Sequence, residues 1–233
     1  MDYKNIRSLV LEEGGVPGEF RGECTPDACD IMVVGEAPGP DEAEAGRPFI
    51  GRAGKLLAAL LTECGIEDYY ITNTVKHFPG RDAKFKIRAP SKEEVLKWSK
   101  VLEWELELIK PKAVLLLGIP ACKTVFGGQW SMGKLAGSKI EKDGVTYYAA
   151  FHPASFLYNQ GTAANTRNMN TFRRTLREIV GGEQREDYAY EVLPPNIYEG
   201  SLIIDIETPG DTDPRTAKIT EWTILPFDKT PVV

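Results

Sequence analysis

The sequence predicts a three-layer α/β/α fold around a central parallel sheet of four strands. Four short apolar runs between residues 31 and 151 have the branched and aromatic side chains of buried strands. Longer segments with helical periodicity separate these runs. Strands that alternate with helices form parallel sheets covered by helices on both faces. The length of 233 residues and the hydrophobic content of 42% allow a sizeable core.

We expect strands and helices to alternate regularly along this part of the chain. Val, Ile, Leu and aromatic residues mark the strands, whereas apolar residues three and four positions apart mark the helices. Gly181 and Gly182 end the last helix. The expected strands are Ile31–Val34, Tyr69–Thr72, Ala113–Leu117 and Val145–Phe151, and the expected helices are Ala53–Cys64, Lys92–Leu108, Ala121–Phe126 and Asn165–Val180.

The C-terminal part of the chain has a different character. Residues 183–200 are polar and contain Pro194-Pro195, which is typical of a linker. Two further strands, at residues 201–206 and 218–227, predict a β-hairpin. About 33 residues cannot bury a core by themselves. The expected organisation is therefore a domain at residues 1–182, a linker at 183–200 and a partial domain at 201–233.

The net charge of −6 is unevenly distributed. From Glu183 onward eleven acidic residues face four basic ones, so the first 182 residues carry a net charge of +1. The segment from Lys76 to Arg88 contains five basic residues and one acidic residue. It is either a solvated surface loop or a phosphate-contacting loop. The sequence shows neither a run of about 20 apolar residues nor a leader, so we expect an intracellular protein without membrane contact.

The four cysteines do not predict a metal site. Cys24 and Cys29 lie in a polar loop, whereas Cys64 and Cys122 fall on apolar helical faces, where small buried thiols are common. We interpret all four as structural or free thiols.

Three polar residues without a packing role stand where expected strands end. Glu36 follows the first strand, Asn73 follows the second and His152 follows the last. In open α/β sheets ligands bind outside the carboxyl ends of the strands, so these side chains are expected to share one pocket. The loop Gly35–Gly39 lets the backbone approach a ligand, and Phe49 offers a flat apolar face. This combination suits a nucleotide or a base.

These residues belong to three motifs in a fixed order. Gly35-Glu36-Ala37-Pro38-Gly39 continues to Phe49 and Gly54, Asn73 precedes Lys76, and His152-Pro153-Ala154-Ser155 precedes Leu157. From about residue 16 to residue 180 the chain resembles the uracil-DNA glycosylase superfamily, and in particular its family four. The resemblance implies an enzyme that flips deoxyuridine out of DNA and hydrolyses its N-glycosidic bond.

The resemblance implies how the base would be recognised. Phe49 would stack on uracil in a pocket that includes Ala37. Asn73 would read the N3 and O4 edge, because an amide offers both a donor and an acceptor. Glu42 would lie near C5 and help to exclude the methyl group of thymine.

The resemblance also implies catalytic and DNA-binding roles. His152 would donate a hydrogen bond to O2 as negative charge develops on the leaving base. Glu36 would position water or stabilise the sugar cation, and Glu42 completes the expected catalytic set. The expected DNA contacts are Lys76, Arg81, Lys84, Lys86, Arg88, Ser155 and Leu157.

The chain departs from family four at the ligands of that family's iron-sulfur cluster. Four cysteines hold the cluster in the family, whereas here His77 follows Lys76 and Trp98 stands at the expected helix position. No cysteine precedes Cys24. We therefore expect no iron-sulfur cluster and no other cofactor, with local packing around Trp98 in its place.

Residues 205–219 resemble the first motif of the 3′–5′ exonuclease domain of family A DNA polymerases. Asp205-Ile206-Glu207-Thr208 is followed by Asp213-Pro214-Arg215. The resemblance implies that Asp205 and Glu207 would bind a divalent metal in a complete exonuclease domain. We expect no nuclease activity from this chain alone. The implied partners are DNA and the rest of a DNA polymerase polypeptide.

Two functional hypotheses follow from these patterns. The first is a uracil-DNA glycosylase domain of a phage DNA polymerase, which acts as a monomer on uracil-containing DNA in the host cytoplasm. The second is a catalytically silent module that binds uracil or DNA for the polymerase. Retention of Glu36, Asn73 and His152 favours the enzyme, whereas loss of the cluster ligands and the fusion favour the binding module.

Overall fold

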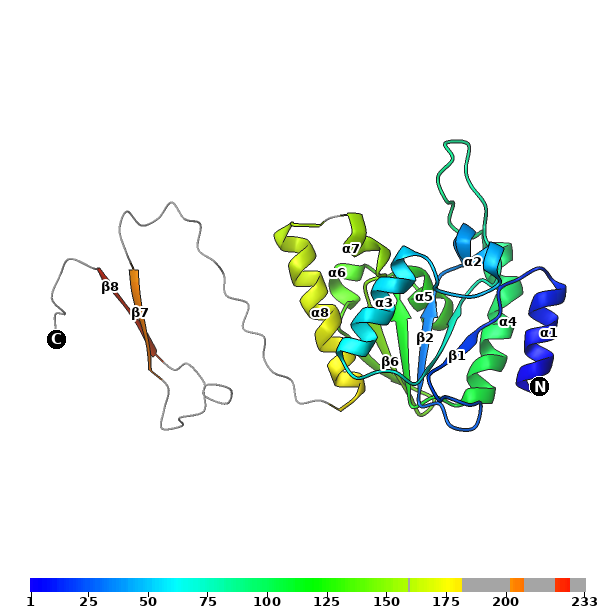
Figure 1. Ribbon diagram of the computed structural model, residues 1–233, viewed down its shortest axis with the longest axis horizontal. Coiled ribbons are helices and arrows are strands. Elements are labelled where there is room, and N and C mark those ends of the chain that lie inside the picture. The colour runs from blue at the N-terminus through cyan, green and yellow to red at the C-terminus, as the bar shows by residue number, and fades with distance from the viewer. Residues whose placement is uncertain (159, 182–201, 208–220, 227–233) are drawn as a thin grey trace. The chain divides into compact units, whose positions relative to one another are not determined.

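The computed structural model describes residues 1–158, 160–181, 202–207 and 221–226. The chain divides into two compact units, Met1–Asp187 and Tyr188–Val233. The first unit is a six-stranded sheet between two layers of helices (Figure 1). Within the described residues, no helix is both long and apolar enough to cross a bilayer.

The predicted parallel strands form the centre of the sheet. They lie side by side in the order β3 (Tyr69–Asn73), β2 (Ile31–Gly35), β4 (Ala113–Leu117) and β6 (Val145–Ala150). Nearly all of their residues are buried, which explains the continuous apolar runs in the sequence. Their carboxyl ends lie at the same edge of the sheet (Figure 1).

Two edge strands make the sheet mixed, with six strands where the sequence predicts four. β1 (Glu19–Arg21) pairs antiparallel with β3, and β5 (Lys139–Lys142) pairs antiparallel with β6. Both strands were missed because they carry no apolar run. β1 has three half-buried residues, and β5 is charged and mostly exposed, as is common for strands that must not pair further.

Two helices cover one face of the sheet. α3 (Arg52–Glu63) and α8 (Ala163–Ile179) begin and end within two residues of the predicted bounds. Leu57 of α3 and Phe172 of α8 are almost fully buried in one core cluster with Val33 of the sheet. This cluster fixes the two helices against the central strands.

The other face is covered by α4 (Lys92–Ile109) and α5 (Gly118–Phe126). Their apolar residues pack in a second core cluster with the alternate residues of the same strands. α1 (Tyr3–Glu12), which the sequence did not predict, packs outside α4, where Ile6 and Val10 share a third cluster with Trp98. The short helices α2 (Pro40–Ala45), α6 (Met132–Leu135) and α7 (Ala154–Tyr158) were also not predicted.

α4 begins with a local signal that fixes its position. The Ser91 side chain accepts a hydrogen bond from the Glu94 backbone N–H, and the Glu94 carboxylate accepts one from the Ser91 N–H. This capping box satisfies two backbone donors that a helix leaves unpaired. It therefore also fixes where the loop before α4 ends.

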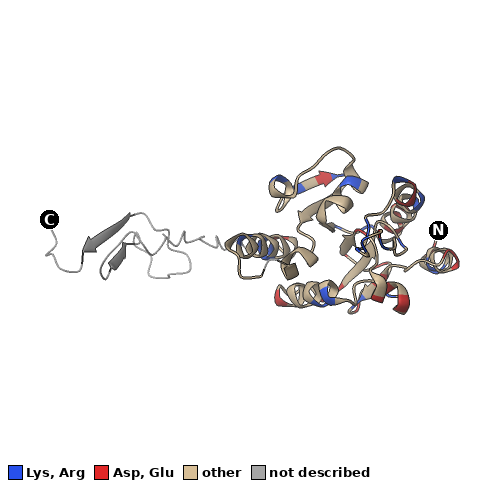
Figure 2. Cartoon of the chain, turned by 90° about the horizontal axis from the view of Figure 1, so that it is seen from above, with Lys and Arg blue, Asp and Glu red and all other residues tan. Residues whose placement is uncertain are grey.

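Charged residues lie on the outer helices and edge strands, whereas the central sheet is almost free of them (Figure 2). The loop before β2 contains a disulfide between Cys24 and Cys29. The sequence did not predict this pairing. Cys64 is a half-buried free thiol and Cys122 is a buried one, as expected for helical faces.

The second unit contains the predicted hairpin. β7 (Leu202–Glu207) pairs antiparallel with β8 (Glu221–Pro226). The predicted linker at residues 183–200 and the turn at 208–220 lie outside the described residues. The metal-binding roles expected for Asp205 and Glu207 stay predictions.

Candidate functional site

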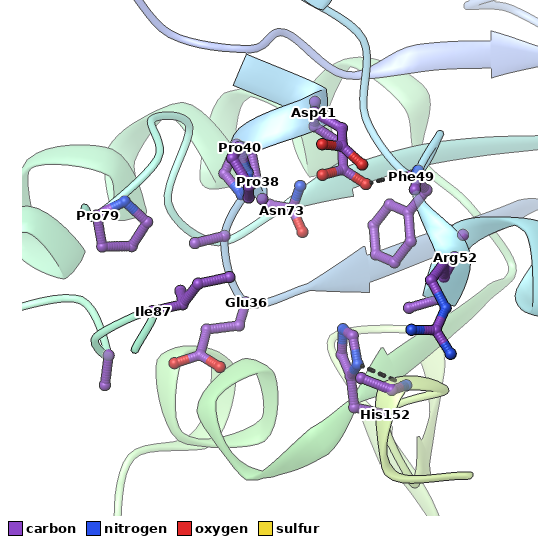
Figure 3. Close-up of a pocket in the computed structure, with 18 of the residues that line it drawn as sticks. Glu36, Pro38, Pro40, Asp41, Phe49, Arg52, Asn73, Pro79, Ile87 and His152 are labelled. Carbon is purple, nitrogen blue, oxygen red and sulfur yellow. Dashed lines mark hydrogen bonds between the residues drawn. The ribbon is translucent and has the colours of Figure 1, made fainter. Parts of the chain in front are cut away.

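A cavity of about 550 Å³ opens at the carboxyl ends of the central strands. Glu36 follows β2, Asn73 ends β3 and His152 follows β6, and all three line the cavity together with Phe49 (Figure 3). These residues are far apart in the sequence. The structure brings them together, as the strand ends predicted. Ala37, Glu42, Arg88 and Leu157 also line the cavity.

The back wall of the cavity depends on the absence of a side chain at Gly35. A Cβ atom there would overlap the Phe49 ring and the Asn73 side-chain oxygen. Asn73 is buried, with 3% of its surface exposed. The glycine therefore lets an aromatic ring and an amide lie against the same strand end.

Phe49 has an uncommon backbone conformation, with φ of 54°. A bulky residue in the left-handed region is strained and persists only when its surroundings fix it. Gly54 leaves room for this conformation, because a Cβ atom at position 54 would overlap the Phe49 backbone. The Phe49 ring lies at 28° to the His152 ring, with centroids 6.2 Å apart.

His152 is held as a neutral ring with a defined tautomer. The backbone N–H of Ala154 donates to Nδ1 of His152 at 3.2 Å, which leaves the ring proton on Nε2. Burial lowers the pKa of His152 to about 4, although the charge of Glu42 opposes this shift. At neutral pH the ring therefore has an uncharged N–H donor.

The Glu36 carboxyl group lacks the support that buried carboxylates usually have. Burial raises the pKa of Glu36. Within the described part of the chain, no residue donates a hydrogen bond to this carboxylate. Its backbone is fixed instead, because the carbonyl accepts from the Thr74 hydroxyl at 2.7 Å and from the Val75 N–H at 2.9 Å. Glu36 is thus a positioned carboxylate that is free to bind water.

Glu42 has a structural contact as well as a place at the cavity. Its carboxylate accepts a hydrogen bond from the Gly51 N–H at 2.9 Å. This bond ties α2 to the residue that precedes α3. The hydrogen bond therefore holds the carboxylate at the wall of the cavity.

Lys76 does not lie on the surface, and its expected contact with DNA is wrong. Its side chain is fully buried and forms an ion pair with Glu105, with Nζ and Oε2 2.6 Å apart. Nζ also donates to the Thr72 hydroxyl at 2.6 Å and to the Asn73 carbonyl at 2.7 Å. Glu105 in turn accepts from the Tyr70 hydroxyl at 2.9 Å. Lys76 thus holds the carboxyl end of β3 in place through Thr72 and Asn73.

The other expected DNA contacts have different surroundings. Arg88 lines the cavity and pairs with both carboxylate oxygens of Glu94, at 2.7 and 2.6 Å. Ser155 does not line the cavity, and its hydroxyl donates to the His152 carbonyl at 2.8 Å. Arg81, Lys84 and Lys86 are exposed.

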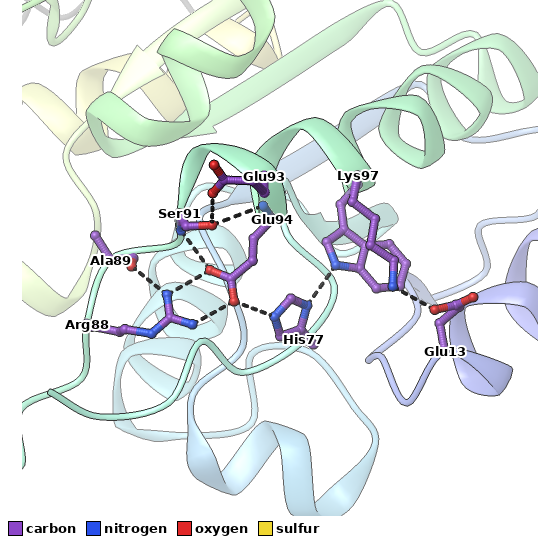
Figure 4. Close-up of polar contacts among 9 residues, drawn as sticks. Glu13, His77, Arg88, Ala89, Ser91, Glu93, Glu94 and Lys97 are labelled. Carbon is purple, nitrogen blue, oxygen red and sulfur yellow. Dashed lines mark hydrogen bonds and ion pairs between the residues drawn. The ribbon is translucent and has the colours of Figure 1, made fainter.

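The two positions where family four has cluster ligands contact each other directly. The indole N–H of the buried Trp98 donates to Nδ1 of His77 at 2.7 Å. The other ring nitrogen of His77 lies 2.8 Å from a carboxylate oxygen of Glu94, which also binds Arg88 (Figure 4). Hydrogen bonds from Arg88, from the Ser91 backbone N–H and from His77 hold the pKa of Glu94 well below its usual range.

These residues do not fit an iron-sulfur cluster. Clusters are held by thiolates, whereas an indole and a hydrogen-bonded imidazole occupy this place. Cys24 and Cys29 are joined to each other. Among the described residues, no group of three or more His, Cys, Asp or Glu side chains is arranged to hold a metal ion.

Sequence reasoning missed several residues that line the cavity. Asp41 lies in the first turn of α2, Arg52 begins α3, and Pro79 and Ile87 belong to the loop before α4. Tyr158, 84% exposed, lies at the rim beside Leu157. A signal for Asp41 and Arg52 was available, since both are polar residues within the first motif.

Comparisons with known proteins agree on one family. The model of the uracil DNA glycosylase superfamily matches residues 22–179. A type-4 uracil-DNA glycosylase of Sulfurisphaera tokodaii is 36% identical over 167 residues, which cover 67% of this chain and 71% of that protein. One of Thermotoga maritima is 40% identical over 154 residues, covering 64% and 73%. A DNA polymerase of Bacillus phage SP01 is 28% identical over 144 residues, covering 60% of this chain and 15% of the polymerase.

Proposed function

Because the chain belongs to the uracil-DNA glycosylase superfamily, we propose that it hydrolyses the N-glycosidic bond of deoxyuridine in DNA. The observation that carries this proposal is the convergence of Glu36, Phe49, Asn73 and His152 on one cavity. The target atom of such a reaction is inaccessible inside a duplex, so the nucleotide must leave the stack first. A cavity of about 550 Å³ has room for an extruded pyrimidine.

The base is recognised by a ring and an amide. Phe49 stacks on the uracil, and its fixed backbone keeps the ring in place before the base arrives. The Asn73 amide donates to O4 and accepts from N3–H. Ala37 lies on the same side of the cavity. Glu42, held by the Gly51 N–H, is positioned to disfavour a methyl group at C5.

His152 stabilises the leaving base. As the glycosidic bond breaks, the bonding electrons move onto the uracil ring and negative charge develops at O2. The Nε2–H of neutral His152 donates to that oxygen, and a preorganised donor of this kind stabilises developing charge. The ring does not have to lose a proton before it acts as a neutral donor, because its pKa of about 4 lies below neutral pH.

Glu36 acts on the sugar. The carboxylate stabilises the positive charge that develops on the deoxyribose ring and orients a water molecule toward its C1′ atom. The water oxygen bonds to C1′ as the C1′–N1 bond breaks, and the proton that the water loses passes through Glu36 and solvent to the uracil anion, which leaves an abasic site and neutral uracil. The absence of described donors to the carboxylate supports this role, because its oxygens are available to water.

We further propose that the domain is part of a DNA polymerase polypeptide. The similarity to the phage polymerase supports this context. So does the acidic motif in β7, whose Asp205 and Glu207 would bind metal only in a complete exonuclease domain. The DNA substrate would then be the template strand of the polymerase.

An excision assay tests the glycosylase activity. A single-stranded oligonucleotide with one deoxyuridine is incubated with the protein and then cleaved with alkali. We expect cleavage at the uracil position and none in a matched oligonucleotide with thymidine. The Glu36→Gln variant serves as the slow control, with excision expected to be about 10² lower. Measurable DNA binding without any abasic product would contradict the proposal and support the silent binding module.

A further inference from the structure

The outer part of the basic loop is an ordered hairpin that the proposed chemistry does not use. We call residues 80–88 the hairpin 80–88. Arg81 and Ile87 form a bridge, and the Asp82 N–H donates to the Lys86 carbonyl at 2.8 Å. The hairpin projects above α2, at the end of the sheet where the carboxyl ends of the central strands lie (Figure 1).

The only acidic residue of the hairpin is engaged by its backbone. The Asp82 carboxylate accepts from the N–H groups of Lys84 and Lys86, at 2.8 and 2.9 Å. Both lysine side chains are exposed, and neither forms an ion pair with a described residue. Two positive charges therefore stand at the tip of the hairpin without an ion-pair partner among the described residues, and Asp82 is the single negative charge of the hairpin.

Phe85 lies between these lysines and has no packing role. Its side chain is 81% exposed, and its φ is 59°. Its carbonyl accepts from the Arg81 guanidinium at 2.8 Å and its N–H donates to the Asp82 carbonyl at 2.9 Å. These bonds hold a strained backbone. The result is an aromatic ring presented to solvent on a fixed support.

We propose that the hairpin 80–88 binds single-stranded DNA next to the flipped nucleotide. Phe85 stacks on an unpaired base, and Lys84 and Lys86 contact the phosphates on either side. This proposal rests on the proposed function and specifies its substrate class. Sites for single strands combine positive charge with aromatic side chains in this way, because every base has a face on which a ring can stack.

The position of the hairpin supports this occupant. Ile87 and Arg88 line the cavity, and Phe85 stands two residues before Ile87, at most roughly 7 Å along the chain. Stacked nucleotides of one strand are about 3.4 Å apart, so Phe85 reaches a base two or three nucleotides from the flipped one. A protein partner is the less suitable occupant, since lysines are depleted in the centre of protein interfaces.

Fluorescence anisotropy with a labelled single-stranded oligonucleotide that lacks deoxyuridine tests the proposal. Phe85→Ala should weaken binding roughly tenfold, because stacking on an aromatic ring contributes about that factor per base. Binding to the corresponding duplex should change little. Phe85→Trp should retain the affinity, and its tryptophan fluorescence should be quenched by DNA more than that of the wild type. Leu11→Ala, at an exposed apolar residue of α1, is the matched control.

The lysines are tested by salt dependence. The double variant Lys84→Gln/Lys86→Gln should reduce the slope of log affinity against log salt by about 1.4, since each phosphate contact on a single strand contributes about 0.7. Lys4→Gln, at an exposed lysine of α1, should leave the slope unchanged.

Unchanged single-strand affinity in Phe85→Ala would overturn the proposal, as would an equal loss of affinity for duplex. Binding of a polymerase fragment that depends on Phe85, with normal DNA affinity, would assign the hairpin to a protein partner instead. The oligonucleotide contains no uracil, so these outcomes do not depend on excision. A protein that binds as expected but fails to excise uracil would overturn only the proposed function.

Discussion

Lys76 and the hairpin 80–88 belong to the same connection between β3 and α4, yet their positive charges lie in opposite environments. Lys76 is fully buried and paired with Glu105, whereas Lys84 and Lys86 are exposed and unpaired among the described residues. Counting charge along the sequence treats these lysines alike. The fold divides them into one that holds the carboxyl end of β3 and two that are open to solvent.

The largest effect that separates the two environments is expected from Lys76→Met. Removing one partner of a buried ion pair leaves the Glu105 charge uncompensated, which costs about 3–5 kcal/mol of stability. Lys84→Met, an exposed lysine, should change stability by less than about 0.5 kcal/mol. Urea denaturation measures both values.

A compensating variant sharpens this result. In Lys76→Met/Glu105→Gln no unpaired charge remains, and the Gln side chain still accepts from the Tyr70 hydroxyl. We expect it to recover part of the lost stability. Equal losses in Lys76→Met and Lys84→Met would show that burial does not distinguish the two lysines.

At the cavity, His152→Ala should lower the single-turnover excision rate by about 10² or more, because a preorganised donor to the leaving group is lost. The matched control is His77→Gln, which changes the chain's other histidine. His77 lies outside the cavity lining, so the rate should stay close to that of the wild type. If both variants lose activity equally, His152 has no direct role at the leaving base.

Glu36→Gln should change activity and stability in opposite directions. Excision should fall by about 10², the low end of what a positioned acid or base contributes. Stability at pH 7 should rise. Burial raises the folded-state pKa of Glu36 above its unfolded value, so the charged form is disfavoured in the folded protein, and glutamine removes this penalty. The gain should shrink as the pH falls below the raised pKa and should vanish below the pKa of the unfolded glutamate. Glu44→Gln, at an exposed residue of α2, should change neither property.

The smallest effect is a difference in the pH dependence of stability. The folded-state pKa of His152 is about 4, and an unfolded histidine has a pKa of about 6.5. Between these values the unfolded chain binds more protons, so the contribution of His152 is complete above pH 6.5 and is lost as the pH falls toward 4. Unfolding free energies at pH 7 and pH 5 should differ less in His152→Gln than in the wild type. Identical differences would contradict the buried, neutral ring.

The residues that sequence reasoning located share one property, which is a local pattern strong enough to be read without partners. The apolar runs of β2 and β4 and the periodicity of α3 placed the sheet and its layers. The end of each strand then placed Glu36, Asn73 and His152 at one edge. Phe49 was located from the segment that follows the first strand, and the family likeness gave it a stacking role.

What sequence reasoning missed depends on contacts that are distant or geometric. Lys76 can be buried because it pairs with Glu105, 29 positions later. No local sequence pattern indicates that pairing. β5 is polar because it lies at an edge, and polar strands resemble loops in a sequence. The positive φ of Phe49 requires Gly54, whose role becomes visible only in three dimensions.

Both ends of the connection between β3 and α4 are held by ion pairs to α4. Lys76 near its start binds Glu105 of α4, and Arg88 near its finish binds Glu94 in the first turn of α4. Both ends of the loop are therefore fixed to the same helix. The residues between these two ion pairs can therefore be shortened, lengthened or replaced while Asn73 keeps its place at the end of β3.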